Sequence, residues 1–152
     1  MKRTMIAACA ALLLSSPVAW SMGGDDAPAA DPTYRTAAKL IGQHRFAEAV
    51  PLLKQIVARD PGNADAYNEL GFVSRKLGDR AAALDYYAIA LKLDPRHLGA
   101  TEYLGELYAE SGDLPHAEAQ LARVAELCHG KCEAFTELET AIQHHQPSKV
   151  GG

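Results

Sequence analysis

The chain is organised around two consecutive stretches of equal length that share one pattern. Residues 64–97 read ADAYNELGFVSRKLGDRAAALDYYAIALKLDPRH, and residues 98–131 read LGATEYLGELYAESGDLPHAEAQLARVAELCHGK. The matched pairs are Leu70/Leu104, Gly71/Gly105, Gly78/Gly112, Asp79/Asp113, Ala83/Ala117 and Leu93/Leu127. A fixed offset of about 34 residues is typical of helix–turn–helix units, which bury their apolar faces by stacking on one another. The pattern therefore predicts an array of paired helices.

A degenerate copy precedes these two stretches in the same phase. Ala49 stands one period before Ala83, and Pro61 stands one period before Pro95. Further aligned positions are Leu53/Tyr87/Leu121 and Ile56/Ala90/Val124. We therefore expect three repeats, at about 30–63, 64–97 and 98–131. The expected helices are about Thr33–Gly42, Phe46–Arg59, Ala64–Leu77, Arg80–Leu91, Leu98–Ser111 and Leu114–Leu127.

On these residues the chain resembles the tetratricopeptide-repeat (TPR) family. The resemblance implies an all-α superhelix of three repeats that acts as a scaffold for protein–protein interaction. Small residues at Gly71 and Gly105 are expected where the two helices of a repeat meet closely. Gly78 and Gly112 are expected to end the first helix of their repeats in a left-handed conformation. The aspartates that follow them are placed to cap the second helix.

A further helix is expected at 133–145, after the third repeat. Phe135, Leu138, Ala141 and Ile142 form one apolar stripe at spacings of three and four residues, and Glu137 and Glu139 are expected to face away from it. A helix of this kind would cap the open end of the array. Residues 32–145 then form the repeat domain, and residues 146–152 form a tail.

Composition excludes several classes of function. The 152 residues suffice for one domain, and the 48% hydrophobic and 22% charged residues fit a packed protein. The formal net charge of −4 provides no basic surface for nucleic acid. The sequence contains no Gly-rich phosphate loop, no His-Glu-x-x-His and no Gly-x-Ser-x-Gly, so we expect no enzyme, no catalytic residue and no cofactor.

The N-terminus has the pattern of an export signal. Lys2 and Arg3 precede an apolar run from Met5 to Leu14, and the residues before Ser21 suit cleavage after it. The sequence thus predicts a signal peptide at 1–21, a flexible lead-in at 22–31 and a periplasmic or secreted protein without a stable membrane anchor. The alternative is lipid attachment at Cys9, which a continuing apolar run after that residue disfavours.

Two cysteines remain after removal of the leader, Cys128 and Cys132. In an exported protein such a pair indicates a disulfide, here between the second helix of repeat three and the capping helix. The alternative is a thiol- or metal-handling accessory protein. A metal site would recruit His129 and His116 together with the two thiolates.

The remaining candidate site is the groove that the first helix of each repeat lines in TPR proteins. Carried over by position, its residues are Tyr34, Ala38, Ile41, Asp65, Asn68, Phe72, Arg75, Lys76, Glu102, Glu106, Ala109 and Glu110. Three of them, Glu102, Glu106 and Glu110, are four residues apart and predict an exposed acidic ridge. The sequence therefore predicts a protein or peptide partner with basic residues and an apolar anchor that contacts Phe72. A structural subunit that self-associates end to end is a third alternative.

Overall fold

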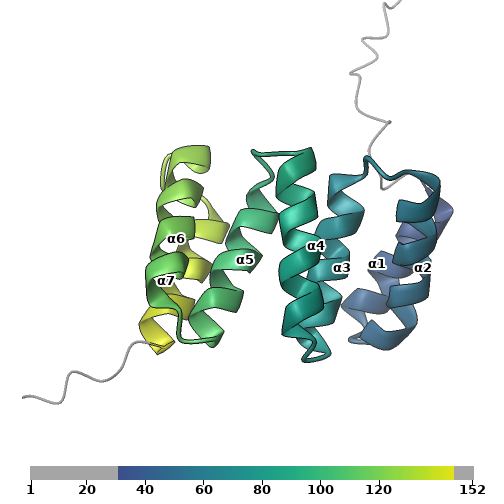
Figure 1. The fold of residues 1–152 in the computed structure, drawn as a ribbon, viewed down its shortest axis with the longest axis horizontal. Helices are drawn as coiled ribbons and strands as arrows, with labels where there is room; N and C mark the ends of the chain where they lie inside the picture. Colours follow the sequence, from purple (N-terminus) through teal and green to yellow (C-terminus); the bar gives the residue numbers. More distant parts are fainter. Residues whose placement is uncertain (1–30, 146–152) are drawn as a thin grey trace, which may run out of the picture.

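The computed structural model describes residues 31–145, which form helices joined by short turns, with no strand in this range. The helices are α1 (Pro32–Gly42), α2 (Phe46–Arg59), α3 (Ala64–Lys76), α4 (Arg80–Leu93), α5 (Leu98–Glu110), α6 (Leu114–Cys128) and α7 (Glu133–His145). They stand side by side along the long axis, from α1 and α2 at one end, through α3, α4 and α5, to α6 and α7 at the other (Figure 1). The predicted all-α repeat fold is confirmed, with helix ends within two residues of expectation. The predicted signal peptide, all but the last residue of the lead-in, and the tail lie outside the described residues.

The helices pack in consecutive pairs, α1 on α2, α3 on α4 and α5 on α6, and α7 packs on both α5 and α6. Ala49, Ala83 and Ala117 are fully buried where the pairs meet, and Tyr87 is a fully buried large side chain in the same layer. Within residues 31–145, no helix is long and apolar enough to cross a membrane.

Gly71 and Gly105 lie at close helix contacts, as expected. A β-carbon at Gly71 would stand 2.5 Å from the ring of Tyr87 on α4. A β-carbon at Gly105 would stand 2.6 Å from Leu138 on α7 and 3.0 Å from Gln120 on α6. Gly105 therefore makes room for the capping helix as well as for its own partner helix.

The turns inside the repeats need a left-handed residue. Gly78 and Gly112 have φ of 85° and 78°, and the side chains of Asp79 and Asp113 accept hydrogen bonds from the amides of the following helix. In repeat one the corresponding residue is His44, which adopts φ of 58° despite its side chain. This conformation is costly for a residue with a β-carbon, so the degenerate repeat keeps the turn without its glycine.

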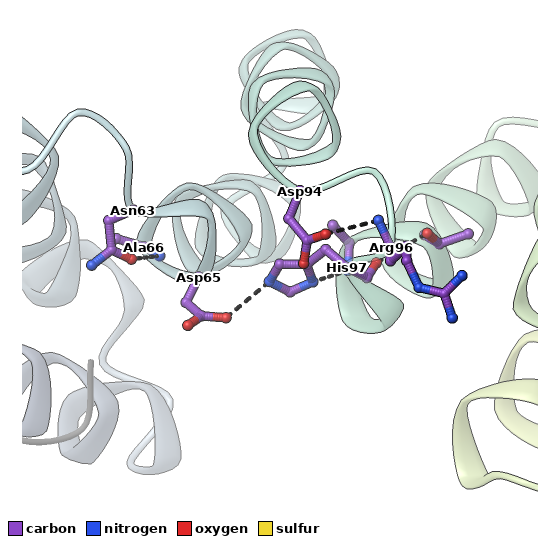
Figure 2. A network of polar contacts seen from close by, with 8 residues as sticks. Asn63, Asp65, Ala66, Asp94, Arg96 and His97 are labelled. Carbon is purple, nitrogen blue, oxygen red and sulfur yellow. Dashed lines mark hydrogen bonds and ion pairs between the residues drawn. The ribbon is translucent and has the colours of Figure 1, made fainter. Parts of the chain in front are cut away.

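A polar network joins repeats two and three (Figure 2). Asn63 caps α3 by accepting a hydrogen bond from Ala66. His97, at the equivalent position of the next repeat, caps α5 by accepting a hydrogen bond from Ala100 through Nδ1. Because Nδ1 accepts, Nε2 carries the proton and donates to Asp65 at 3.0 Å. The cap of one repeat is thereby tied to the first helix of the preceding repeat.

The chain turns back after α6 through two left-handed residues, His129 (φ 57°) and Gly130 (φ 64°). This turn brings Cys128 and Cys132 to a Cα separation of 5.9 Å, which suits a disulfide. Both side chains are half-buried against the core cluster of α5, α6 and α7.

Helix α7 closes the array by burying its apolar stripe on α5 and α6. Leu138 is fully buried, and Ile142 and Ala134 are nearly so. Leu138 continues the series of Leu70 and Leu104 at the same spacing along the chain. In sequence and in position, α7 therefore corresponds to the first helix of a fourth repeat.

Candidate functional site

A cavity of about 590 Å³ opens along the face formed by α3, α5 and α7, and we call it the groove. Its walls come from the first helices of repeats two and three and from the capping helix. The lining residues are Phe72, Arg75 and Lys76 on α3, Tyr103 and Glu106 on α5, and Thr136, Glu137, Thr140, Ala141, His144 and His145 on α7. A cavity of this size accommodates side chains of a peptide or a small ligand.

Aromatic rings line one side of the groove. The rings of Phe72 and Tyr103 are 5.2 Å apart between centroids, and Phe46 of α2 lies 6.0 Å from Phe72. The ammonium of Lys76 stands 5.2 Å from the centroid of Phe72. Phe72 and Tyr103 are only half-buried, so the groove presents apolar rings next to charged groups.

Arg75 holds two carboxylates of α5 from its place on α3. Its side chain is 3% exposed and forms ion pairs with Glu106 and, at 3.0 Å, with Glu110. The guanidinium also lies 5.7 Å from the centroid of the Tyr103 ring. The charges of Glu106 and Glu110 are therefore partly neutralised within the protein, and the predicted ridge of free carboxylates is wrong at these two positions.

Glu102 is buried instead of exposed, with 6% of its surface accessible. Burial raises the pKa of its carboxyl to about 8, and the hydrogen bond to Glu137 and the charge of Glu106 act in the same direction. The prediction of an exposed Glu102 fails because α7 packs against α5 and brings Glu137 over it. Glu137 is exposed on the side away from the apolar stripe, as expected, and there it lines the groove.

The structure gathers only part of the predicted set of groove residues. Phe72, Arg75, Lys76 and Glu106 line the groove. Tyr34 and Ile41 pack against the first core cluster, and Asn68, Ala109 and Glu102 are buried behind the surface. Of the others, Ala38 is exposed, and Asp65 and Glu110 are partly buried.

The prediction missed Tyr103 and every groove residue of α7. The signal for α7 was present in the period, because the residues one period after Glu102, Glu106 and Glu110 are Thr136, Thr140 and His144. All three line the groove together with Glu106. Extending the repeat by one more unit would have found them.

The metal site considered as an alternative does not assemble around His116. His116 lies in the first turn of α6, where it bonds to Asp113 at 2.7 Å, and Cys128 ends the same helix. The helix between them separates His116 from Cys128 by roughly 18 Å, so the two cannot share a metal. Another group of potential ligands is Glu102, Glu106 and Glu137, whose carboxylate oxygens lie within 4.8 Å of one another.

Comparisons with known proteins agree with this architecture. A family model described as tetratricopeptide repeat matches residues 34–72 and 74–130. The probable biofilm formation methyltransferase WspC of Pseudomonas aeruginosa is 40% identical over 79 residues, which cover 52% of this chain and 18% of WspC. The probable N-acetylglucosaminyltransferase SPINDLY of Hordeum vulgare is 29% identical over 123 residues, which cover 76% of this chain and 13% of SPINDLY. The chain thus spans less than a fifth of either relative.

Solved structures show the same fold. The Sgt2 TPR domain of Aspergillus fumigatus has a TM-score of 0.68 and 18% identity, covering 82% of this chain and 89% of that domain. The type III secretion chaperone SycD of Yersinia enterocolitica, in complex with a peptide of the translocator YopD, has a TM-score of 0.67 and 18% identity over 74% of this chain and 88% of SycD. Since the family model covers more than half of the chain, this protein belongs to the tetratricopeptide-repeat family.

Proposed function

We propose that the protein is a non-catalytic scaffold that binds a segment of another protein in the groove. The observation that carries this proposal is the cavity itself, which sets the half-buried rings of Phe72 and Tyr103 beside charged side chains of three helices. Packing of the array does not require these rings to remain accessible. The peptide-bound structure of SycD supports the proposal by analogy of fold.

The occupant we propose is an extended or helical segment with an apolar anchor. The aromatic rings would supply most of the affinity, because large side chains in desolvated pockets dominate binding energies. The charged groups at the rim would set orientation and association rate. Since the matched parts of WspC and SPINDLY are less than a fifth of those proteins, we carry no enzymatic activity over.

The test starts with capture of the partner from the native cell envelope, followed by titration of the isolated segment. Phe72→Ala and Tyr103→Ala should each weaken binding about tenfold or more, as expected for central aromatic contacts. Ile89→Ala removes a comparable exposed side chain from α4, outside the groove, and should leave affinity unchanged. Equal affinities for all three variants would show that the partner binds elsewhere.

We also propose that the protein acts after export, in the periplasm or outside the cell. The proposal rests on the charge, apolar run and cleavage pattern of residues 1–21. Intact-mass analysis of the native protein should give a chain that begins at Met22. A retained leader, or a lipid on Cys9, would contradict export by cleavage after Ser21.

For the cysteines we propose a structural disulfide rather than the thiol- or metal-handling alternative. Cys128 and Cys132 are half-buried in the core cluster that fixes α7, and neither lines the groove. A bond between them would tie the end of α6 to the start of α7. Thiol titration of protein purified without reductant should find no free thiol, whereas two reactive thiols would favour the alternative.

A further inference from the structure

Three carboxyl groups converge on the wall of the groove where α5 and α7 meet. The oxygens of Glu102, Glu106 and Glu137 lie within 4.8 Å of one another, and the last two line the cavity. The guanidinium of Arg75 is engaged by Glu106 and Glu110. The Glu102/Glu137 pair is therefore left with no cation bound directly to it among the ion pairs of the described residues.

One oxygen of the innermost carboxyl of this group lacks a donor. Oε1 of Glu102 is buried and accepts no hydrogen bond from the described residues. A buried carboxylate with an unpaired oxygen is costly, so Glu102 keeps a proton that it can share with Glu137. The same burial raises the pKa of Glu102 to about 8, so the proton is held at neutral pH. Glu137, the other member of the pair, lines the groove.

A cationic side chain is a better replacement for that proton than a metal ion. Glu106 is committed to Arg75, so a metal would find two free carboxyl groups, whereas Ca²⁺ takes six to eight oxygen ligands. A Lys or Arg side chain instead needs one or two carboxylates for its head and an apolar surface for its stem. The rings of Phe72 and Tyr103 provide that surface in the same cavity.

We propose that the segment bound in the groove places a Lys or Arg side chain against Glu137 and Glu102, and that this cation displaces their shared proton into solvent. The proposal rests on the proposed function and specifies the chemistry of its partner. No covalent bond changes within the partner. One proton leaves the carboxyl pair, and the incoming side chain keeps its own charge, because Lys and Arg remain protonated well above pH 8.

Other charged groups face this pair from all three helices. Arg75 and Lys76 on α3 are positive, Glu106 and Glu110 on α5 are negative, and His144 and His145 stand at the end of α7. Arg75 lowers the pKa of Glu102, while Glu106 and Glu137 raise it. Loss of the proton from the Glu102/Glu137 pair predicts a dependence of binding on pH that ends near pH 8.

The experiment uses the full mature protein and a random peptide library displayed on phage, selected at pH 9. Selected peptides should pair a Lys or Arg with an aromatic or aliphatic residue. Calorimetry of a selected peptide at pH 7, in two buffers of different ionisation enthalpy, should show release of about one proton. Affinity should rise about tenfold per pH unit between pH 6 and pH 8 and then level off.

Glu102→Gln is the decisive variant, because it keeps the shape of the neutral carboxyl and cannot ionise. It should abolish proton release and the pH dependence, whereas Glu139→Gln, an exposed change on α7, should leave both intact. If Glu102→Gln disturbs folding, as judged by circular dichroism, Glu137→Gln tests the contact instead: it removes one of the two carboxylates and should weaken binding of the basic peptide.

The outcomes separate this inference from the proposed function. Peptides that lose binding with Phe72→Ala but carry no basic residue, or release no proton, would overturn the inference and leave the groove as the binding site. Selection of no groove-dependent peptide would overturn both. Proton release on addition of millimolar Ca²⁺ or Mg²⁺ alone would assign the site to a metal ion and also overturn the inference.

Discussion

Gly71 illustrates how one residue fixes the spacing of two helices. A β-carbon there would stand 2.5–2.9 Å from three ring atoms of Tyr87. Gly71→Ala should therefore lower the free energy of unfolding by about 1–3 kcal/mol, the usual cost of overpacking a core. Urea denaturation measures the change. Gly42→Ala is the control, because nothing lies within 4 Å of its added carbon and the helix gains up to about 1 kcal/mol. Equal effects of both changes would contradict the close contact.

Glu102 makes stability depend on pH. Its pKa is about 8 in the folded protein, against 4.5 for an ordinary glutamic acid. Below pH 4.5 both states hold the proton. Between pH 4.5 and 8 the unfolded chain gives it up while the folded protein keeps it, so the free energy of unfolding falls as pH rises.

Thermal melts of wild type and Glu102→Gln from pH 5 to pH 9 test this dependence. In the variant, the melting temperature should fall less as pH rises, and at pH 9 it should be higher than that of wild type. Glu69, whose pKa burial raises to about 7, contributes a decline of the same sign in both proteins, so the difference between them isolates Glu102. Parallel curves would show that Glu102 is ionised in the folded protein.

Residues whose role depends on the local backbone could be predicted, and residues whose role depends on a distant element could not. Gly78 and Asp79 sit in a turn whose left-handed residue favours glycine and whose next residue caps α4, so the repeat pattern identified them. The burial of Glu102 depends on where α7 lies, beyond the whole of α6 in the chain. A four-residue spacing of carboxylates contains no information about that contact.

At the scale of elements, α7 both completes the core and forms a wall of the groove. Leu138 is its fully buried anchor and fills the space left by Gly105. Leu138→Ala should cost about 2–5 kcal/mol, because the lost contacts leave a cavity between α5, α6 and α7. Hydrogen exchange should then show faster exchange in α5–α7 and little change in α1–α4, since repeats contact only their neighbours.

Glu139→Ala provides the matched control, as an exposed neighbour on the same helix that should change stability by less than about 0.5 kcal/mol. Uniform loss of protection along the whole chain with Leu138→Ala would mean that the array unfolds as a single unit. The cap would then not be a local element.

The helices themselves followed from the repeat period and the apolar stripes, and their ends deviate by at most two residues. The side of α7 that lines the groove could not be predicted in this way, because the apolar stripe of α7 indicates only which side packs on α5 and α6. The polar residues opposite that stripe have no periodic signal of their own. Their role emerges when Thr136 and Thr140 are aligned with Glu102 and Glu106 of the preceding repeat.

In the whole molecule, the groove is shared by consecutive units of the array. Its walls are α3, α5 and α7, and Phe46 of α2 supports Phe72 from repeat one. A bound segment would therefore contact two repeats and the cap at once. Changes in the spacing between units would alter the site without touching a lining residue.

Chemical-shift mapping shows whether the partner segment binds in the groove. The ¹⁵N-labelled protein is titrated with the partner segment, and the backbone amides are followed by NMR. In the wild-type protein we expect the chemical-shift changes to concentrate in α3, α5 and α7, around Phe72, Tyr103 and Thr140. In the Tyr103→Ala variant these changes should be largely absent. Chemical-shift changes confined to α4 and α6 would contradict binding in the groove. Ile89 and Leu93 are exposed apolar side chains that would report such binding on α4.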